Sequence, residues 1–125
     1  MIKFYNINTE AFVPISHEKS YLFNFYDKLS NFLAINISSQ YKLKHFLAKP
    51  VKNNYEIDFY SIYNGLVFSE DLQPNEKDKV LTKYRDIIDI INKKIEELEY
   101  SKDDNKKDWA KLLKLVFNYK NNLVY

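Results

Sequence analysis

Two acidic side chains, Glu56 and Asp58, have a spacing that could support hydrolytic chemistry. Alternate residues of a β-strand point to the same face, so this pair would present two carboxylates on one surface, where they could bind a cation or flank a glycosidic bond. The spacing is also ordinary on a solvated strand, and a cross-strand pair between Asp58 and Lys44 would explain Asp58 without catalysis. We therefore expect no enzyme, and a hydrolase using Glu56 and Asp58 is the least favoured hypothesis.

Metal and cofactor sites are also not expected. The only imidazoles are His17 and His45, and the chain has no cysteine to join them as a metal ligand. His45 alternates with Leu43 and Leu47, which is typical of a packed side chain. The chain has one glycine, Gly65, whereas dinucleotide-binding and phosphate-binding loops need several at fixed spacing. The sequence predicts no catalytic residue, no metal and no cofactor.

A second hypothesis is a nucleic-acid-associated protein. Lysines interleaved with aromatic residues can neutralise phosphates while the rings stack on bases, and the candidates are Lys42, Lys44, Lys49 and Lys52. The net charge of only +2 and the single arginine, Arg85, weigh against this hypothesis. Nucleic-acid binding is therefore an alternative that the sequence does not favour.

The favoured hypothesis is recognition of another protein, or of a second copy as a homodimer. The chain has eleven tyrosines and nine phenylalanines, and tyrosine is enriched at interfaces because it buries a large area yet keeps a polar tip. Aromatic residues outside the predicted core stripes are the candidate partner-binding residues: Tyr60, Tyr63, Phe68, Tyr119 and Tyr125. Tyr60 and Tyr63, near Gly65, are preferred.

Three helices are expected to support such a surface. Apolar and aromatic residues at three- and four-residue spacing predict an aromatic amphipathic helix over about 17–36, with Ser16 as its N-cap. A long helix should open near Pro74 and run to Leu98. A third, capped by Asp103 or Asp104, should pack against it as an antiparallel C-terminal helix pair.

The expected strands lie between these helices. Residues 2–15 read as an extended N-terminal arm with at most a short strand. Alternating residues in 41–47 and 55–59 predict an antiparallel hairpin with residues 50–54 as the turn. This register places Leu47 opposite Tyr55, Leu43 opposite Phe59 and Lys44 opposite Asp58. The apolar run 66–68 could add a third strand, and the apolar residues 122–125 could form a final strand or continue into a longer natural protein.

Together these elements predict an α+β fold in a single domain, residues 1–125, which could be the N-terminal part of a longer protein. No run of residues is long and apolar enough for a membrane span, so a soluble, cytoplasmic protein is expected. Heavy use of Asn, Lys and Ile is typical of an AT-rich genome. We therefore expect a small subunit, adaptor or inhibitor in a bacterial, phage or viral assembly.

Overall fold

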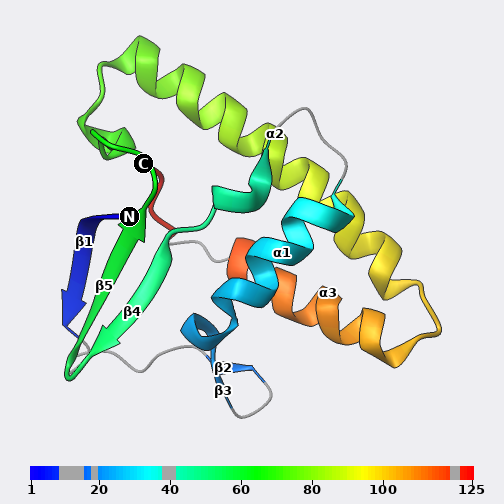
Figure 1. Ribbon diagram of the computed structural model, residues 1–125. Helices are drawn as coiled ribbons and strands as arrows, with labels where there is room; N and C mark the ends of the chain where they lie inside the picture. The colour runs from blue at the N-terminus through cyan, green and yellow to red at the C-terminus, as the bar shows by residue number, and fades with distance from the viewer. Residues whose placement is uncertain (9–15, 18–19, 38–41, 119–121) are drawn as a thin grey trace. The chain divides into compact units, whose positions relative to one another are not determined.

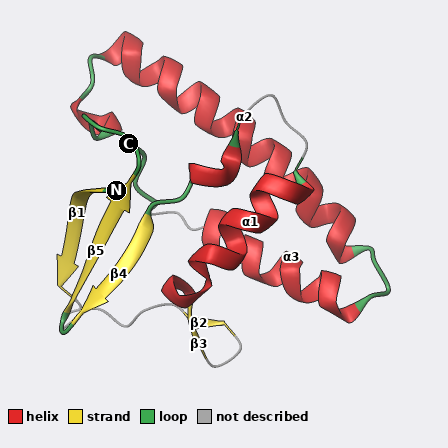
Figure 2. Ribbon diagram, in the orientation of Figure 1, coloured by secondary structure: helices red, strands yellow, loops and turns green. Residues whose placement is uncertain are grey.

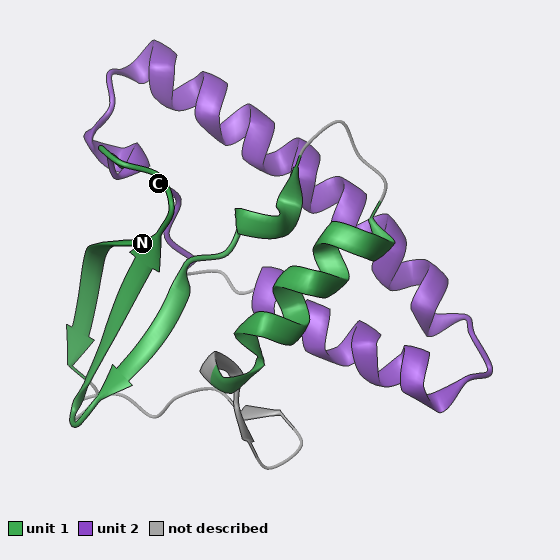
Figure 3. Cartoon of the chain, in the orientation of Figure 1, with its two compact units in different colours: residues 1–66 green, residues 67–125 purple. Residues whose placement is uncertain are grey.

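A computed structural model describes residues 1–8, 16–17, 20–37, 42–118 and 122–125 (Figure 1). The fold is α+β, as the sequence predicts (Figure 2). The chain divides into two compact units, residues 1–66 and residues 67–125 (Figure 3). The first unit carries a β-sheet and helix α1, and the second carries helices α2 and α3. The single domain expected from the sequence stays a prediction.

The main sheet of the first unit has three described strands in the order β1-β5-β4. Strand β1 is Ile2–Asn8, β4 is Lys49–Asn53 and β5 is Glu56–Ser61. Both pairings of the central strand β5 are antiparallel (Figure 1). A three-stranded sheet with one apolar face is large enough to be stable once that face is covered, unlike an isolated hairpin.

The predicted hairpin is present, but the predicted register and the predicted position of the turn are wrong. Pro50 is not in the turn: it lies in β4 opposite Phe59, and the chain reverses at Asn54 and Tyr55. Asn54 has a φ of 54°, a left-handed conformation that asparagine tolerates better than most residues. Leu43–His45, predicted as strand, forms a short 3₁₀ helix, η2. Apolar alternation over so few residues fits one 3₁₀ turn as well as a strand.

The third strand of the sheet comes from a different segment than expected. The N-terminal arm contributes seven residues as β1 and pairs along β5 from Ile2 opposite Ser61 to Asn8 opposite Glu56. The pairing is irregular between Lys3 and Tyr5, which marks a β-bulge. Residues 66–68, predicted as a strand, are not one.

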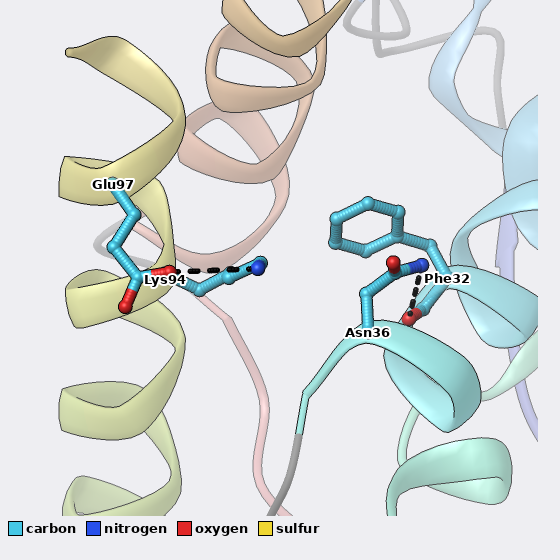
Figure 4. Close-up of polar contacts among 4 residues, drawn as sticks. All are labelled: Phe32, Asn36, Lys94 and Glu97. Carbon is cyan, nitrogen blue, oxygen red and sulfur yellow. Dashed lines mark hydrogen bonds and ion pairs between the residues drawn. The ribbon is translucent and has the colours of Figure 1, made fainter. Parts of the chain in front are cut away.

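The first unit also contains helix α1, Tyr26–Asn36, preceded by the 3₁₀ helix η1, Leu22–Phe25. The predicted start of this helix is wrong, because Ser16–His17 and Ser20–Tyr21 form two short paired strands, β2 and β3. The predicted apolar stripe is confirmed within α1, where Leu29, Phe32 and Leu33 are buried. At the end of α1, Asn36 Nδ2 donates to the Phe32 carbonyl at 3.3 Å (Figure 4).

The second unit confirms the two predicted C-terminal helices. Helix α2 is Pro74–Glu99 and begins with proline, whose fixed φ and missing N–H suit the first helical position. Helix α3 is Asp104–Phe117, and its N-cap Asp103 accepts a hydrogen bond from the Asn105 backbone N–H at 2.9 Å. The cap and the apolar stripes together explain why these helices can be predicted from the sequence.

The helix pair buries one side of each helix. Buried residues recur on α2 at Ile87, Ile91, Ile95 and Leu98, and on α3 at Ala110, Leu112, Leu113 and Phe117. Ion pairs lie outside this core: Lys114 pairs with Glu99 between the helices, and Lys94 Nζ lies 3.5 Å from Glu97 Oε2 along α2 (Figure 4). Burial of apolar area, rather than these exposed charges, holds the pair together.

The C-terminal residues pack back onto the segment before α2. The Ser69 backbone N–H donates to the Val124 carbonyl at 2.8 Å, and the rings of Phe68 and Tyr125 lie 5.2 Å apart. Asn122 Nδ2 also donates to the Val116 carbonyl at 2.7 Å, near the end of α3. No strand is formed over residues 122–125, so that prediction is wrong.

Candidate functional site

The sheet has one apolar and one polar face, and its register defines both. Residues directly opposite each other in paired strands lie on the same face. The apolar face includes Tyr5 and Phe59, whose rings lie 5.9 Å apart. The other side, here called the polar sheet face, is made of Lys3, Asn6, Asn8, Lys49, Val51, Asn53, Glu56, Asp58 and Tyr60.

Asp58 lies at the centre of the polar sheet face and is only 8% exposed. Its Oδ1 atom accepts a hydrogen bond from Asn6 Nδ2 at 2.6 Å and lies 4.0 Å from Lys3 Nζ. The predicted pairing of Asp58 with Lys44 is wrong, because Lys44 belongs to η2 and not to a strand beside β5. The charge and hydrogen-bonding capacity of Asp58 are thus matched by β1, the neighbouring strand.

Glu56 and Asp58 share the polar sheet face, as their spacing predicts, but their surroundings differ. Glu56 is exposed and has no ion pair among the described residues, whereas Asp58 is buried against Asn6. A buried carboxylate held by a charge-assisted hydrogen bond performs a structural task in this position. This arrangement gives Asp58 a structural role, so catalysis is not needed to explain an aspartate at this position.

A cross-strand row on the polar sheet face brings together Lys3, Tyr60 and Lys49. Tyr60, a predicted partner-binding residue, is half-buried in the central strand with one lysine opposite it on each neighbouring strand. Lys49 makes no ion pair with any described residue. Sequence reasoning missed Lys3, because its place beside Tyr60 depends on a pairing between segments far apart in the chain.

The four candidate nucleic-acid lysines do not share one surface. Lys49 and Lys52 are three residues apart in β4 and therefore lie on opposite faces of the sheet. Lys42 and Lys44 lie at the start of η2 and within it. Only Lys49 of this group is on the polar sheet face. Nucleic-acid binding by these lysines stays a prediction.

A second candidate surface lies where β5 ends. Large apolar side chains there are exposed, and they form what we call the strand-end patch: Met1, Ile2, Ile62 and Tyr63. Ile2 lies opposite Ser61, which directly precedes Ile62. The Tyr63 backbone N–H donates to Ser61 Oγ at 3.1 Å. The backbone at Tyr63 is therefore anchored to the end of β5, and Tyr63 is 52% exposed.

The chain bends over residues 62–65, just after β5. Gly65 has a φ of +69°, which residues with side chains rarely adopt, and a Cβ atom placed there would meet nothing within 4 Å. The requirement for glycine is therefore conformational and does not come from packing. The left-handed φ of Gly65 explains why a glycine occupies this bend.

The other predicted partner-binding residues belong to the second unit or are not described. Phe68 and Tyr125 contact each other in the second unit and are half-buried, and Tyr119 lies outside the described residues. The structure thus assigns Tyr60 to the polar sheet face, Tyr63 to the strand-end patch, and Phe68 and Tyr125 to a contact within the helical unit.

Within the described residues, no three acidic or histidine side chains come together to hold a metal ion. The helices of the same residues also include none with the length and apolar character of a membrane span. Two buried polar atoms in this part of the chain have no hydrogen-bond partner, Ser30 Oγ in α1 and His45 Nδ1 in η2. Neither atom belongs to the polar sheet face or the strand-end patch.

Comparison with known proteins adds no relative to these observations. No family model, no curated protein and no solved structure matches this chain.

Proposed function

We propose that this chain is a non-enzymatic protein–protein interaction module, a cytoplasmic subunit, adaptor or inhibitor in a bacterial, phage or viral assembly. The observation that carries the proposal is the strand-end patch, where Ile62 is 46% exposed and Tyr63 is 52% exposed directly after the central strand. Neighbouring large apolar side chains exposed to water are a common mark of a binding surface.

Two properties of the strand-end patch support recognition of a protein. Tyrosine gives a large contact area with only two side-chain torsions to fix, so its burial in an interface costs little entropy. The hydrogen bond from the Tyr63 N–H to Ser61 Oγ restrains the backbone between the end of β5 and Tyr63. A restrained surface loses less freedom when it binds a partner.

Side-chain contacts are a better basis for this recognition than strand addition at a sheet edge. Pro50 in the edge strand β4 has no N–H to offer to an incoming strand. The other edge strand, β1, has its irregular pairing between Lys3 and Tyr5, and such bulges discourage edge pairing. The proposal therefore places recognition on side chains beyond the end of β5.

The test is a pull-down from the native host with the tagged chain and with the double variant Ile62→Ala/Tyr63→Ala. A partner identified by mass spectrometry and then purified should bind the wild type and lose at least about tenfold in affinity for the variant, since hot-spot truncations commonly cost that much. The matched control is Ile35→Ala/Tyr100→Ala, which removes the same side chains from exposed sites elsewhere. Circular dichroism and thermal unfolding establish that all three proteins fold.

A partner that binds the Ile62→Ala/Tyr63→Ala variant and the control equally well would refute the strand-end patch. Sedimentation of the purified chain over a concentration range separates a homodimer from a second protein, because only self-association changes its mass.

A further inference from the structure

The polar sheet face has opposite charges at its two ends. Lys49 and Glu56 both lack an ion pair among the described residues, and both belong to this face. Lys49 is opposite Tyr60, four residues along β5 from Glu56, which corresponds to about 13 Å in an extended strand. The face therefore presents one positive and one negative site at a fixed separation.

Between these ends the face is neutral and partly apolar. The Asp58 carboxylate is engaged by Asn6 and lies near Lys3, so its charge is matched within the sheet. Val51, directly opposite Asp58, is 40% exposed. The Tyr60 hydroxyl, beside Lys49, makes no hydrogen bond with the described residues and is free to donate to an incoming carboxylate.

The area of the polar sheet face limits the kind of partner that it can bind. Three strands about 4.8 Å apart and five to seven residues long present roughly 300 Å², whereas a stable interface buries about 800 Å² per partner. A second copy bound through this face alone would therefore dissociate readily. A single extended segment of about five residues matches both the length and the width of the surface.

We propose that the polar sheet face binds a short extended peptide segment of a partner protein, with an acidic residue at Lys49 and Tyr60 and a basic residue four positions away at Glu56. Alternate residues of an extended peptide point the same way, so residues i, i+2 and i+4 would contact the face. The middle one would be apolar and would cover Val51. This inference rests on the proposed function as a protein-recognition module and specifies the chemistry of a segment that it recognises.

The same charges weigh against nucleic acid at this site. A phosphate chain passing Lys49 would run along the face toward Glu56, and this carboxylate, which has no ion pair among the described residues, would repel it. A peptide of mixed charge meets an opposite charge at each end. The observations therefore favour the peptide.

The test uses blocked heptapeptides and the full chain, observed by NMR through the backbone amides of Tyr60 and Lys49. The probe carries aspartate and lysine four positions apart, valine midway and serine elsewhere. A control peptide of the same composition has aspartate and lysine adjacent. We expect the first peptide to shift the Tyr60 and Lys49 signals with a dissociation constant that rises with salt, and the control peptide to bind at least about fivefold more weakly.

Charge reversal in the protein provides the matched controls. Lys49→Glu should weaken binding about fivefold or more, and Lys52→Glu, the same change on the opposite face of the same strand, should leave it unchanged. The double variant Lys49→Glu/Glu56→Lys restores two opposite charges and should recover binding, with the peptide reversed in direction. Equal losses for Lys49→Glu and Lys52→Glu would overturn the proposal, because they would show a response to net charge alone.

Three other results would also overturn it: no shift at millimolar probe peptide, equal binding of the two peptides, or tighter binding of an eight-nucleotide single strand at the same amides. The last result would assign the face to nucleic acid. The two proposals fail separately, because Ile62→Ala/Tyr63→Ala should not change binding of the probe peptide. If the probe fails while capture of a partner still depends on Ile62 and Tyr63, the proposed function stands and the peptide inference falls.

Discussion

Asn6 Nδ2 donates a hydrogen bond to Asp58 Oδ1 at 2.6 Å, joining the first strand of the chain to the central strand of the sheet. Because Asp58 is buried, its carboxylate would lose a partner that water cannot fully replace if Asn6 were truncated. This bond also fixes the register, since a slip of one residue would carry Asn6 to the other face.

Asn6→Ala should therefore lower the free energy of unfolding by about 1–3 kcal/mol, the range for a hydrogen bond to a charged group that becomes unsatisfied. Urea unfolding followed by circular dichroism measures the change. Asn53→Ala removes an exposed asparagine from the same face and should change stability by less than about 0.5 kcal/mol. Equal effects of the two variants would contradict the role assigned to Asn6.

The core of the helix pair predicts a larger effect at Leu113, which is 0% exposed in α3. Leu113→Ala should destabilise the chain by about 2–5 kcal/mol, from lost burial and the cavity that remains. Leu115→Ala, on the same helix but 37% exposed, is the control and should cost much less. Thermal unfolding of both variants measures the difference. Similar melting temperatures would show that Leu113 does not belong to the core.

The cap of α3 offers a test at a single backbone hydrogen bond. Asp103→Ala removes the acceptor for the Asn105 N–H and should cost about 1 kcal/mol. Asp104→Ala removes the same charge one residue later without removing that cap, so it separates capping from the interaction with the helix dipole. Denaturant midpoints that drop equally for both variants would assign the effect to charge.

The left-handed backbone at Gly65 predicts that substitution of this residue lowers the stability of the chain. Gly65→Ala should destabilise the chain by about 1 kcal/mol, because alanine disfavours a φ of +69° even where space is open. Gly65→Asn should cost less, since asparagine tolerates the left-handed region. If both substitutions are neutral, residues 62–65 adopt another conformation in solution.

Sequence reasoning succeeded where one local signal governs the structure. Helices α2 and α3 follow from apolar residues on one side, proline at the first helical position and a capping aspartate, all of which act within a few residues. It was less successful at the start of α1, because the residues before Leu22 continue the same periodic pattern and yet form two short strands. Periodicity alone does not fix where a helix begins.

The hairpin shows why register is harder to predict than the presence of strands. Leu43, His45 and Leu47 alternate like strand residues, and Pro50 reads as a turn former, so the sequence favoured the wrong pairing. In the structure Pro50 lies in an edge strand, where a missing N–H is tolerated. The actual turn at Asn54 and Tyr55 lacks the Asn-Gly signature of a two-residue hairpin.

The candidate sites also differ in whether they depend on local sequence or on pairing between distant segments. Tyr63 was selected from the sequence because it lies near Gly65 and fits no core stripe, and its part in binding stays a prediction. The row of Lys3, Tyr60 and Lys49 could not be found, since it requires both pairings of β5 to be known. Contacts between distant segments are set by tertiary packing, which composition and periodicity do not encode directly.

The central place of β5 also sets an order of assembly during synthesis. Strands β4 and β5 are joined by a two-residue turn, so their pairing closes a very small loop and can form within microseconds. Strand β1 leaves the ribosome first but must wait for Glu56–Ser61, and its docking closes a loop of about fifty residues at a higher entropic cost. Newly made chains thus pass through a stage in which the nascent N-terminal strand is still unpaired and open to capture by a chaperone.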